Sequence, residues 1–322
     1  MTLPRIKFAH LPTPVEEMPR LSTHLNGPRL FVKRDDQTGL GMGGNKTRKL
    51  EFVLAEALAV GARTLITVGG IQSNHCRQTA AIAAKFGLKC ILVLSGEEPQ
   101  RVNGNLLLDT MFGASVVWTS RDERDETLKS VFQASVNRDE APFLIPLGAS
   151  TAVGAVGYVE AMRELVSQGE QFDWIVMASS SGGTQAGMVL GAELTHWKGR
   201  LLAISIDHSV EELQSTVSAL SNETAILLNE NARFTPDQIL VNADYLGGGY
   251  AVAGHAEIEA IRLFAEFEGL LLDPVYTGRA AAGMIDLISK GFFNKTDRVL
   301  FWHTGGAPAL FAPSYSQLLS TK

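Results

Sequence analysis

Short runs rich in β-branched and apolar residues alternate with longer amphipathic stretches along most of this 322-residue chain. This alternation is typical of βα units stacked into a parallel sheet, and it constrains the fold more than any other feature. The predicted strands cover residues 30–33, 64–68, 90–94, 115–118, 143–146, 174–178, 201–206 and 298–303. The predicted helices cover residues 45–60, 73–86, 103–112, 124–137, 151–167, 183–196, 257–267 and 279–291. We therefore predict an α/β fold.

The length of the chain exceeds the usual size of a single hydrophobic core, so one large domain or two interlocked domains are both possible. No repeat, low-complexity tract or Pro/Ser-rich linker divides the sequence. A second domain must therefore be nested inside the first. We predict a smaller domain at about residues 50–151, inserted into a larger domain of residues 1–49 and 152–322. The part after the insert is expected to pair with the N-terminal strand.

Charge and composition argue against several classes of partner. The formal net charge is −6, the sequence pI is near 5.7 and no Lys/Arg block occurs, so nucleic acid is not expected. No apolar run approaches the ~20 residues of a membrane helix, and the N-terminal segment lacks the features of a signal peptide. We expect a cytoplasmic protein without a membrane partner. Cys76 and Cys90 are expected to be buried, reduced thiols, and the histidines lack metal spacing, so no metal is expected.

Glycine accounts for 31 residues, and the first of three glycine-rich turns, residues 39–49, has the sequence GLGMGGNKTRK. This turn formally contains G-x-G-x-x-G, but the next predicted strand ends without the acidic ribose ligand, which argues against a nicotinamide oxidoreductase. Lys46 lies at a predicted helix start, where the helix dipole and the nearby Arg48 and Lys49 favour a neutral amine. A lysine with a lowered pKa is what Schiff-base chemistry requires, and a solvated surface lysine is the alternative.

The second turn leads from a strand into a helix at residues 68–84, VGGIQSNHCRQTAAIAA, with Ser73, Asn74 and His75 at the helix entry. Ordinary helix capping is one interpretation, because Ser and Asn are good N-cap residues. The other is functional. A helix N-terminus that carries Ser and Asn can bind a carboxylate, and Ser73 can also transfer a proton.

The third turn, residues 177–187 with the sequence MASSSGGTQAG, joins an apolar strand to a helix rich in small residues. It lacks the Lys and the spacing of a Walker loop, so a small phosphorylated cofactor fits better than a nucleoside triphosphate. Close helix–sheet packing is the alternative explanation for its glycines. The residues that present N–H groups and hydroxyls suited to a phosphate are Ser180, Ser181, Gly182, Gly183 and Thr184.

Together, a Schiff-base lysine, a carboxylate-binding helix start and a phosphate cup are what pyridoxal 5′-phosphate needs to act on an amino acid. The sequence resembles the pyridoxal-phosphate enzymes of the tryptophan-synthase β-subunit fold, in particular the D-cysteine desulfhydrase and 1-aminocyclopropane-1-carboxylate deaminase group. The resemblance implies two three-layer αβα domains with open, twisted, mostly parallel sheets, the smaller nested in the larger, and a homodimer. It rests on RDDQTGLGMGGNKTRKLEF, GGIQSNHCRQTAAIAAK, SSSGGTQAG, LLDPVYTG and FWHTGGAPALF, which span nearly the whole chain.

The resemblance also implies roles for individual residues. Lys46 would form the Schiff base with the cofactor, Ser73 would handle protons, and Asn74 would bind the pyridine 3′-oxygen. Lys46 is also the first candidate for the base that removes the Cα proton, with Ser73 or Tyr276 assisting. The phosphate would be held by Ser181, Gly182, Gly183 and Thr184.

Further positions bear on the substrate. Two tyrosines near the substrate in this family correspond to Tyr276 in DPVYTG and Tyr250 in GGGYAVAG. Deaminases that open the cyclopropane ring carry Glu and Leu where this chain has Thr277 and Thr304. A neutral hydroxyl from Thr304 would leave the pyridine ring a weaker electron sink, which suffices to expel a leaving group from Cβ. His75, where the deaminases carry Gln, favours the desulfhydrases, and the side chains expected to contact substrate are Ser73, Asn74, His75 and Tyr276.

The function that the resemblance implies is α,β-elimination of a three-carbon amino acid, with D-cysteine converted to pyruvate, ammonia and hydrogen sulfide. The opening FAHLPTPVE also resembles L-cysteate sulfo-lyases of the same group. L-cysteate sulfo-lyase, the cyclopropane deaminase and a non-catalytic pyridoxal-phosphate-binding protein remain alternatives. The motifs leave open both the preferred substrate isomer and the leaving group.

Overall fold

The computed structural model describes residues 3–320, and its larger sheet has six strands. All neighbouring strands are parallel except the first pair, which is antiparallel. In spatial order the strands are β1 (Val15–Glu17), β2 (Arg29–Arg34), β10 (Arg298–His303), β7 (Trp174–Ser179), β8 (Arg200–Ser205) and β9 (Leu240–Asn242). The pairing of β10 with β2 confirms that the C-terminal part of the chain returns to the N-terminal strand.

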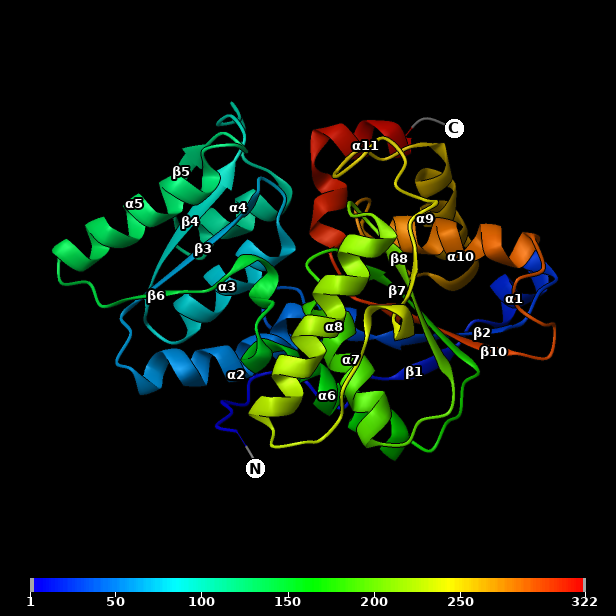
Figure 1. Ribbon diagram of the computed structural model, residues 1–322. Coiled ribbons are helices and arrows are strands. Elements are labelled where there is room, and N and C mark those ends of the chain that lie inside the picture. The colour runs from blue at the N-terminus through cyan, green and yellow to red at the C-terminus, as the bar shows by residue number, and fades with distance from the viewer. Residues whose placement is uncertain (1–2, 321–322) are drawn as a thin grey trace.

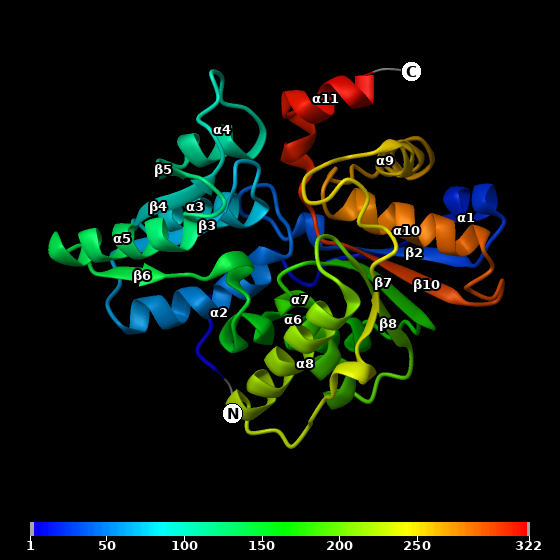
Figure 2. The same cartoon turned by 45° about the horizontal axis from the view of Figure 1, so that its top comes forward.

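Helices cover both faces of this sheet because its central strands are apolar on both sides (Figures 1 and 2). In β10, Val299 and Phe301 belong to one core, whereas Leu300 and Trp302 belong to the other. The first core contains residues of α1 (Pro19–Leu25), α9 (His255–Glu268) and α10 (Thr277–Ser289). The second contains residues of α6 (Ala152–Ser167) and α7 (Gly183–Leu194), and α8 (Val210–Leu227) packs against α7.

The second sheet has four parallel strands, all drawn from one continuous part of the chain between α2 and α6. Their order is β5 (Ser115–Thr119), β4 (Lys89–Ser95), β3 (Thr64–Gly70) and β6 (Pro142–Leu144). One face packs on α2 (Lys46–Ala59), α3 (Asn74–Lys85) and α4 (Gly104–Met111). Alternate residues such as Ile66 and Val93 are also buried, and α5 (Arg124–Asn137) contacts these strands, so we place it on the opposite face.

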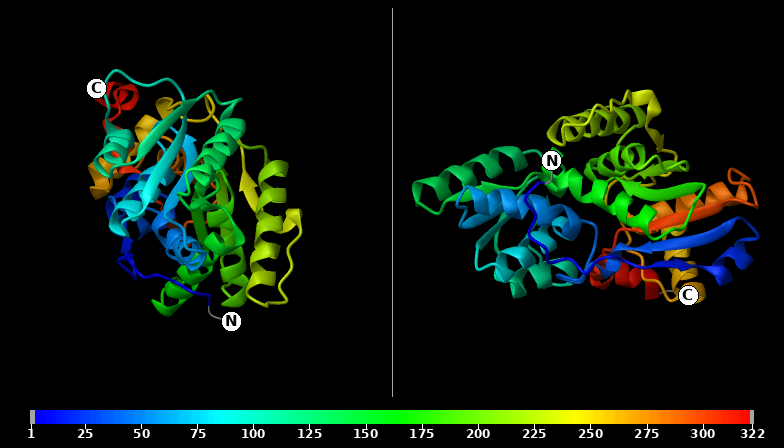
Figure 3. Two further views of the ribbon diagram at one scale, coloured as in Figure 1. Left: turned by 90° about the vertical axis from the view of Figure 1, so that its left-hand side faces the viewer. Right: turned by 90° about the horizontal axis from the view of Figure 1, so that it is seen from below.

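The two sheets lie side by side, and the chain passes from the large sheet to the small one after β2 and returns after β6. Seen from below, the elements of the small sheet occupy one side and those of the large sheet the other, with the N-terminal segment passing beneath (Figure 3). This segment is tied to both parts, because Ile6 N–H donates to the Glu51 carbonyl and Met18 N–H donates to the Leu30 carbonyl. The last helix, α11 (Pro313–Ser320), lies at the top of the view in Figure 1.

The α/β fold with two mostly parallel sheets confirms the predicted fold class, and each predicted strand and helix is present with ends shifted by a few residues. Five further elements, β1, β9, α1, α8 and α11, are present that the sequence pattern did not predict. The strand expected at residues 143–146 ends at Leu144, since Pro146 starts a short 3-10 turn. The domain boundaries stay a prediction. Within residues 3–320, no helix is long and apolar enough to cross a membrane.

Candidate active site

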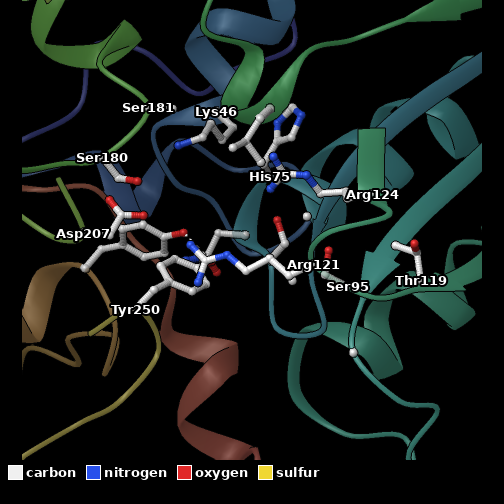
Figure 4. A pocket seen from close by; sticks show the side chains of 18 of the residues that line it. Lys46, His75, Ser95, Thr119, Arg121, Arg124, Ser180, Ser181, Asp207 and Tyr250 are labelled. Atoms are coloured by element: carbon white, nitrogen blue, oxygen red, sulfur yellow. Dashed lines mark hydrogen bonds between the residues drawn. The ribbon is translucent and has the colours of Figure 1, made fainter. Parts of the chain in front are cut away.

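A cavity of about 800 Å³ opens between the two sheets, at the carboxyl ends of their strands. Ligands of open α/β sheets bind at this edge, and the volume suits a cofactor together with a small substrate. Figure 4 shows Lys46, Asp207 and Tyr250 on one side of it and Ser95 and Arg124 on the other. The predicted site residues that line it are Lys46, Ser73, Asn74, His75, Ser181, Gly182, Thr184, Tyr250, Tyr276 and Thr304.

Lys46 is the first residue of α2, and its side chain is partly exposed to the cavity. Its Nζ donates a hydrogen bond of 3.1 Å to Oδ1 of Asn45. Burial lowers the pKa of Lys46 to about 8, the nearby Asp273 acts in the opposite direction, and the Arg77 guanidinium lowers the pKa further. The predicted cause was therefore wrong in part, because Arg48 is neutralised by carboxylates and Arg77 is the cation that acts. With this pKa about a tenth of Lys46 is neutral at pH 7, a far larger fraction than for an ordinary lysine.

A buried ionic network anchors the start of α2. The Arg48 guanidinium forms two hydrogen bonds, of 2.8 and 2.9 Å, with the Asp35 carboxylate and also contacts both carboxylate oxygens of Glu164 at 2.9 Å. The Trp302 indole N–H donates to the same Asp35 carboxylate at 2.8 Å. Because these residues come from η1 (Asp35–Gln37), α2, α6 and β10, the network fixes the position from which Lys46 extends.

The second turn provides a capped helix start. Ser73 is the N-cap of α3, and its Oγ accepts a hydrogen bond of 3.2 Å from the Cys76 N–H. Oδ1 of Asn74 accepts from the side chains of Asn105 and Arg77, which leaves its amide N–H groups available to the cavity. The capping interpretation and the functional one are thus compatible, since a hydroxyl that accepts from the backbone still has a proton to donate.

His75 is buried beside the cavity in its neutral form. Its Nε2 lies 2.8 Å from the Thr67 hydroxyl, which also donates to the Ile145 carbonyl. Burial and the charges of Lys46 and Lys49 hold the pKa of His75 well below its usual value. The backbone of Pro146 raises this pKa, in the opposite direction to burial and the two lysines.

The third turn forms a cup at the N-terminus of α7. The first N–H groups of a helix have no intrahelical acceptor and carry the positive end of the helix dipole. The Ser181 hydroxyl is 2.8 Å from the Ser150 hydroxyl, which also accepts from the Gly183 N–H at 3.3 Å. On the other side, the Asn45 amide donates to the Thr184 hydroxyl at 3.0 Å and so joins the cup to the residue before Lys46. Gly183 does not line the cavity and lies beneath the cup.

Close approach explains the glycines of the cup. A Cβ on Gly183 would lie 2.6 Å from the Ser150 hydroxyl and 2.7 Å from Nζ of Lys49, and one on Gly148 would lie 2.5 Å from the Ser181 hydroxyl. Lys49 is fully buried, and its Nζ donates to the Gly148 carbonyl at 3.0 Å. Burial and the charge of Lys46 hold the pKa of Lys49 well below its usual value. A phosphate dianion suits this helix N-terminus lined by hydroxyls, and its charge would favour the protonated form of the buried lysine behind it. The residues present therefore fit pyridoxal 5′-phosphate, with Lys46 within the same cavity.

Substituting Gly183 by alanine is expected to weaken cofactor binding by about 10- to 100-fold, because the added Cβ separates the cup from Ser150 and Lys49. Titration of the cofactor-free protein with pyridoxal phosphate, followed by absorbance, measures this. The melting temperature of the cofactor-free variant serves as the control for folding. An unchanged dissociation constant would show that the cup does not hold the phosphate.

Two tyrosines that line the cavity are hydrogen-bonded to each other. The hydroxyls of Tyr250 and Tyr276 are 2.8 Å apart, and burial raises the pKa of both. Tyr276 is held in place because the carboxylate of Asp273 accepts from its N–H at 3.0 Å. The Thr277 hydroxyl donates to the same carboxylate at 2.8 Å and lies outside the cavity lining, so Thr304 is the threonine that faces the site.

Several side chains that line the cavity are not among the residues predicted from the sequence. Asp207 follows β8, and a polar residue directly after a predicted strand was an available signal. Asn45 directly precedes Lys46, and the sequence pattern drew attention to the lysine alone. Arg121 and Arg124 come from the segment after β5, where the sequence SRDERDE resembles an ordinary solvated surface. The roles expected for the predicted residues stay predictions, although the structure brings those residues together.

Comparisons with known proteins agree with this geometry. A D-cysteine desulfhydrase of Salmonella typhimurium is 46% identical over 321 residues, covering 96% of each chain, and one of Salmonella typhi matches equally well. A solved structure described as an ACC deaminase homologue is 37% identical, with a TM-score of 0.89 over 98% of this chain and 95% of that chain. A pyridoxal 5′-phosphate-dependent aspartate racemase, 18% identical with a TM-score of 0.65, shares the fold.

The family model described as "Pyridoxal-phosphate dependent enzyme" matches residues 6–305, which include the lysine, the capped helix start and the phosphate cup. The match therefore covers the residues that form the cavity as well as the fold around it. By sequence, fold and the composition of its cavity, this chain belongs to the pyridoxal-phosphate dependent enzymes.

Proposed function

We propose that this protein is a lyase that converts D-cysteine and water to pyruvate, ammonia and hydrogen sulfide. The observation that carries the proposal is Lys46, a lysine of lowered pKa in a cavity shared with a phosphate cup and a pair of tyrosines. The 46% identity to proteins named D-cysteine desulfhydrase, over nearly the full length of both chains, supports the choice of substrate.

When bound, the cofactor supplies an electron sink for the charge that develops at Cα. The Lys46 amine, with its pKa near 8, accepts the Cα proton. The carboxylate of the substrate binds at the N-terminus of α3, where Ser73 and Asn74 present a hydroxyl and amide N–H groups. The Cβ–S bond then breaks with its electron pair leaving on sulfur, and the released 2-aminoacrylate hydrolyses to pyruvate and ammonia.

The tyrosine pair suits protonation of the departing sulfur. Burial keeps both phenols in the neutral form, and the Tyr250 hydroxyl also raises the pKa of Tyr276. Since the two hydroxyls share one hydrogen bond, the other proton of the pair remains available to the cavity. We propose that this proton is given to the sulfide as it leaves.

Thr304 supports elimination at Cβ over opening of a cyclopropane ring. It is buried at the end of β10 and lines the cavity, and its carbonyl accepts from the Asn45 N–H at 3.0 Å. Thr304 is the residue expected beside the pyridine nitrogen, and its hydroxyl is neutral. A carboxylate at this place would instead hold the nitrogen in its protonated form. Expulsion of a thiolate needs less electron withdrawal than cleavage of a C–C bond.

The test is release of a 2-oxo acid from D-cysteine by the pyridoxal-phosphate-loaded protein, with products identified by mass. We expect pyruvate and sulfide in equal amounts. Sulfite and pyruvate from L-cysteate alone, or 2-oxobutyrate from 1-aminocyclopropane-1-carboxylate alone, would reassign the substrate. Retention of pyridoxal phosphate without any product would instead identify a binding protein.

We also propose that the protein is a cytoplasmic homodimer that takes a small amino acid as its partner and binds neither nucleic acid nor membranes. The net charge of −6 supports the exclusion of nucleic acid, and the free, buried thiols of Cys76 and Cys90 suit a reducing compartment. Light scattering during size-exclusion chromatography measures the oligomeric state directly, and a mass of one chain would overturn the dimer.

A further inference from the structure

We propose that Asp207 determines which substituent the enzyme accepts on Cβ, favouring a thiol or another hydrogen-bond donor and rejecting a sulfonate. This inference rests on the proposed function, since it concerns the side chain of the same substrate. It addresses the leaving group, which the sequence motifs leave open.

Asp207 is held rigidly in the cavity wall. It follows β8, and the preceding residue is fixed on both sides, because the Ile206 N–H donates to the Ser179 carbonyl at 3.0 Å and its carbonyl accepts from Arg279 at 2.8 Å. The next turn is closed by Ser205, whose hydroxyl donates to the carbonyl of residue 208 at 2.7 Å. Figure 4 shows the carboxylate between Ser180 and Tyr250 at the side of the cavity.

The carboxylate has an unused acceptor. Its Oδ1 is buried, and within residues 3–320 no hydrogen-bond donor contacts it. Nε2 of the His208 imidazole is 3.6 Å from this oxygen, beyond hydrogen-bond distance. Oδ1 itself is shielded from the cavity, but the side chain is partly exposed and lines it, so a donor on a bound ligand would be stabilised by the accessible part of the carboxylate. No step of the proposed elimination uses this oxygen.

Asp207 acts on the part of the cavity where the leaving group departs. Its charge raises the pKa of both Tyr250 and Tyr276, the tyrosines proposed to protonate the departing sulfur. A β-substituent that reaches this pair is therefore also within the field of the carboxylate. A thiol or an ammonium group can donate to this carboxylate, whereas the negative charge of a sulfonate is repelled.

The charges at the cavity mouth do not reverse this preference. Arg121 is exposed, and Arg124 is half-buried with Asp125 at 3.3 Å, so both are partly screened by solvent and by a carboxylate. The acidic side chains that line the same cavity are Glu97, Glu98, Glu123 and Asp207. Together with Lys46, the lining thus offers three basic side chains against four acidic ones.

The experiment compares binding of D-cysteate and turnover of D-cysteine in the loaded wild-type enzyme, in Asp207→Asn and in Asp207→Ser. We expect both neutral variants to bind D-cysteate about tenfold more tightly, measured as the change in cofactor absorbance on titration and as the inhibition constant. For D-cysteine we expect KM to rise several-fold, with a smaller change in kcat. Asp207→Glu keeps the charge and is expected to keep the weak binding of D-cysteate.

Glu97→Gln is the matched control, because it removes one negative charge from the cavity mouth. We expect it to change D-cysteate binding less than twofold. Unchanged D-cysteate binding in both neutral variants of Asp207, or an equal gain in Glu97→Gln, would overturn the inference. If the wild type failed to release pyruvate from D-cysteine, the proposed function would fall, and the D-cysteate titration would still test the role of Asp207.

Discussion

Replacing Lys46 by alanine is expected to reduce turnover of D-cysteine by roughly 10³-fold or more, because the substitution removes both the covalent attachment point of the cofactor and the proposed Cα base. The absorbance band of the lysine-bound cofactor should vanish in the same variant. The rate of pyruvate release and the absorbance spectrum, both measured on one preparation of the variant, report the two effects together.

Lys85→Ala provides the matched control, because Lys85 is exposed near the end of α3 and lies outside the cavity lining. It should keep both the band and the activity. A pH series adds an independent check, since the pKa of Lys46 near 8 implies that the cofactor-free protein rebinds pyridoxal phosphate faster as the pH rises through that value. A full absorbance band in Lys46→Ala would show that another lysine holds the cofactor.

The second large effect is on stability. Arg48→Met should destabilise the cofactor-free protein by about 3–5 kcal/mol, because it leaves the fully buried Asp35 carboxylate and the adjacent Glu164 without their main cation. The melting temperature measured by calorimetry should fall accordingly. Arg29→Met removes an exposed ion pair with Glu17 and is expected to cost less than about 1 kcal/mol.

The pH dependence of this effect has a definite sign. The Arg48 guanidinium holds the pKa of Asp35 at about 2, below the value of about 3.9 in an unfolded chain. A carboxyl group whose pKa is lowered in the folded protein stabilises the fold fully at pH values above its pKa in the unfolded chain. This stabilisation is lost as the pH falls through about 2. The melting-temperature difference between wild type and Arg48→Met should therefore be largest near neutral pH and shrink in acid. Equal melting temperatures of Arg48→Met and Arg29→Met would contradict the role assigned to the network.

The helices and strands that were not predicted are those whose local sequence pattern is weak or short. Helix α8 contains several Ser and Thr residues that weaken the apolar periodicity, although Ser209 and Glu212 form a capping box that marks its start. Strands β1 and β9 have three residues each, too few for a period of two to stand out. Their places in the sheet depend on pairing with strands far away in the sequence.

The sequence by itself determined the α/β class, the cofactor and the residues of the three turns. Each of these depends on residues that are close together in the sequence. When a strand is followed by a glycine-rich turn and a helix, the N–H groups and hydroxyls of the turn lie at the carboxyl end of that strand. Lys46, Ser73 and the loop at 181–184 could be identified for that reason.

Only the tertiary structure decided which charges act on these residues. The pKa of Lys46 depends on burial and on Arg77, and the hydroxyl pair joins Tyr250 to Tyr276 across 26 positions of the sequence. Asp207 became part of the site because β8 ends beside the cavity. Desolvation and Coulomb interactions depend on distances through space, and those distances are set when the two sheets pack together.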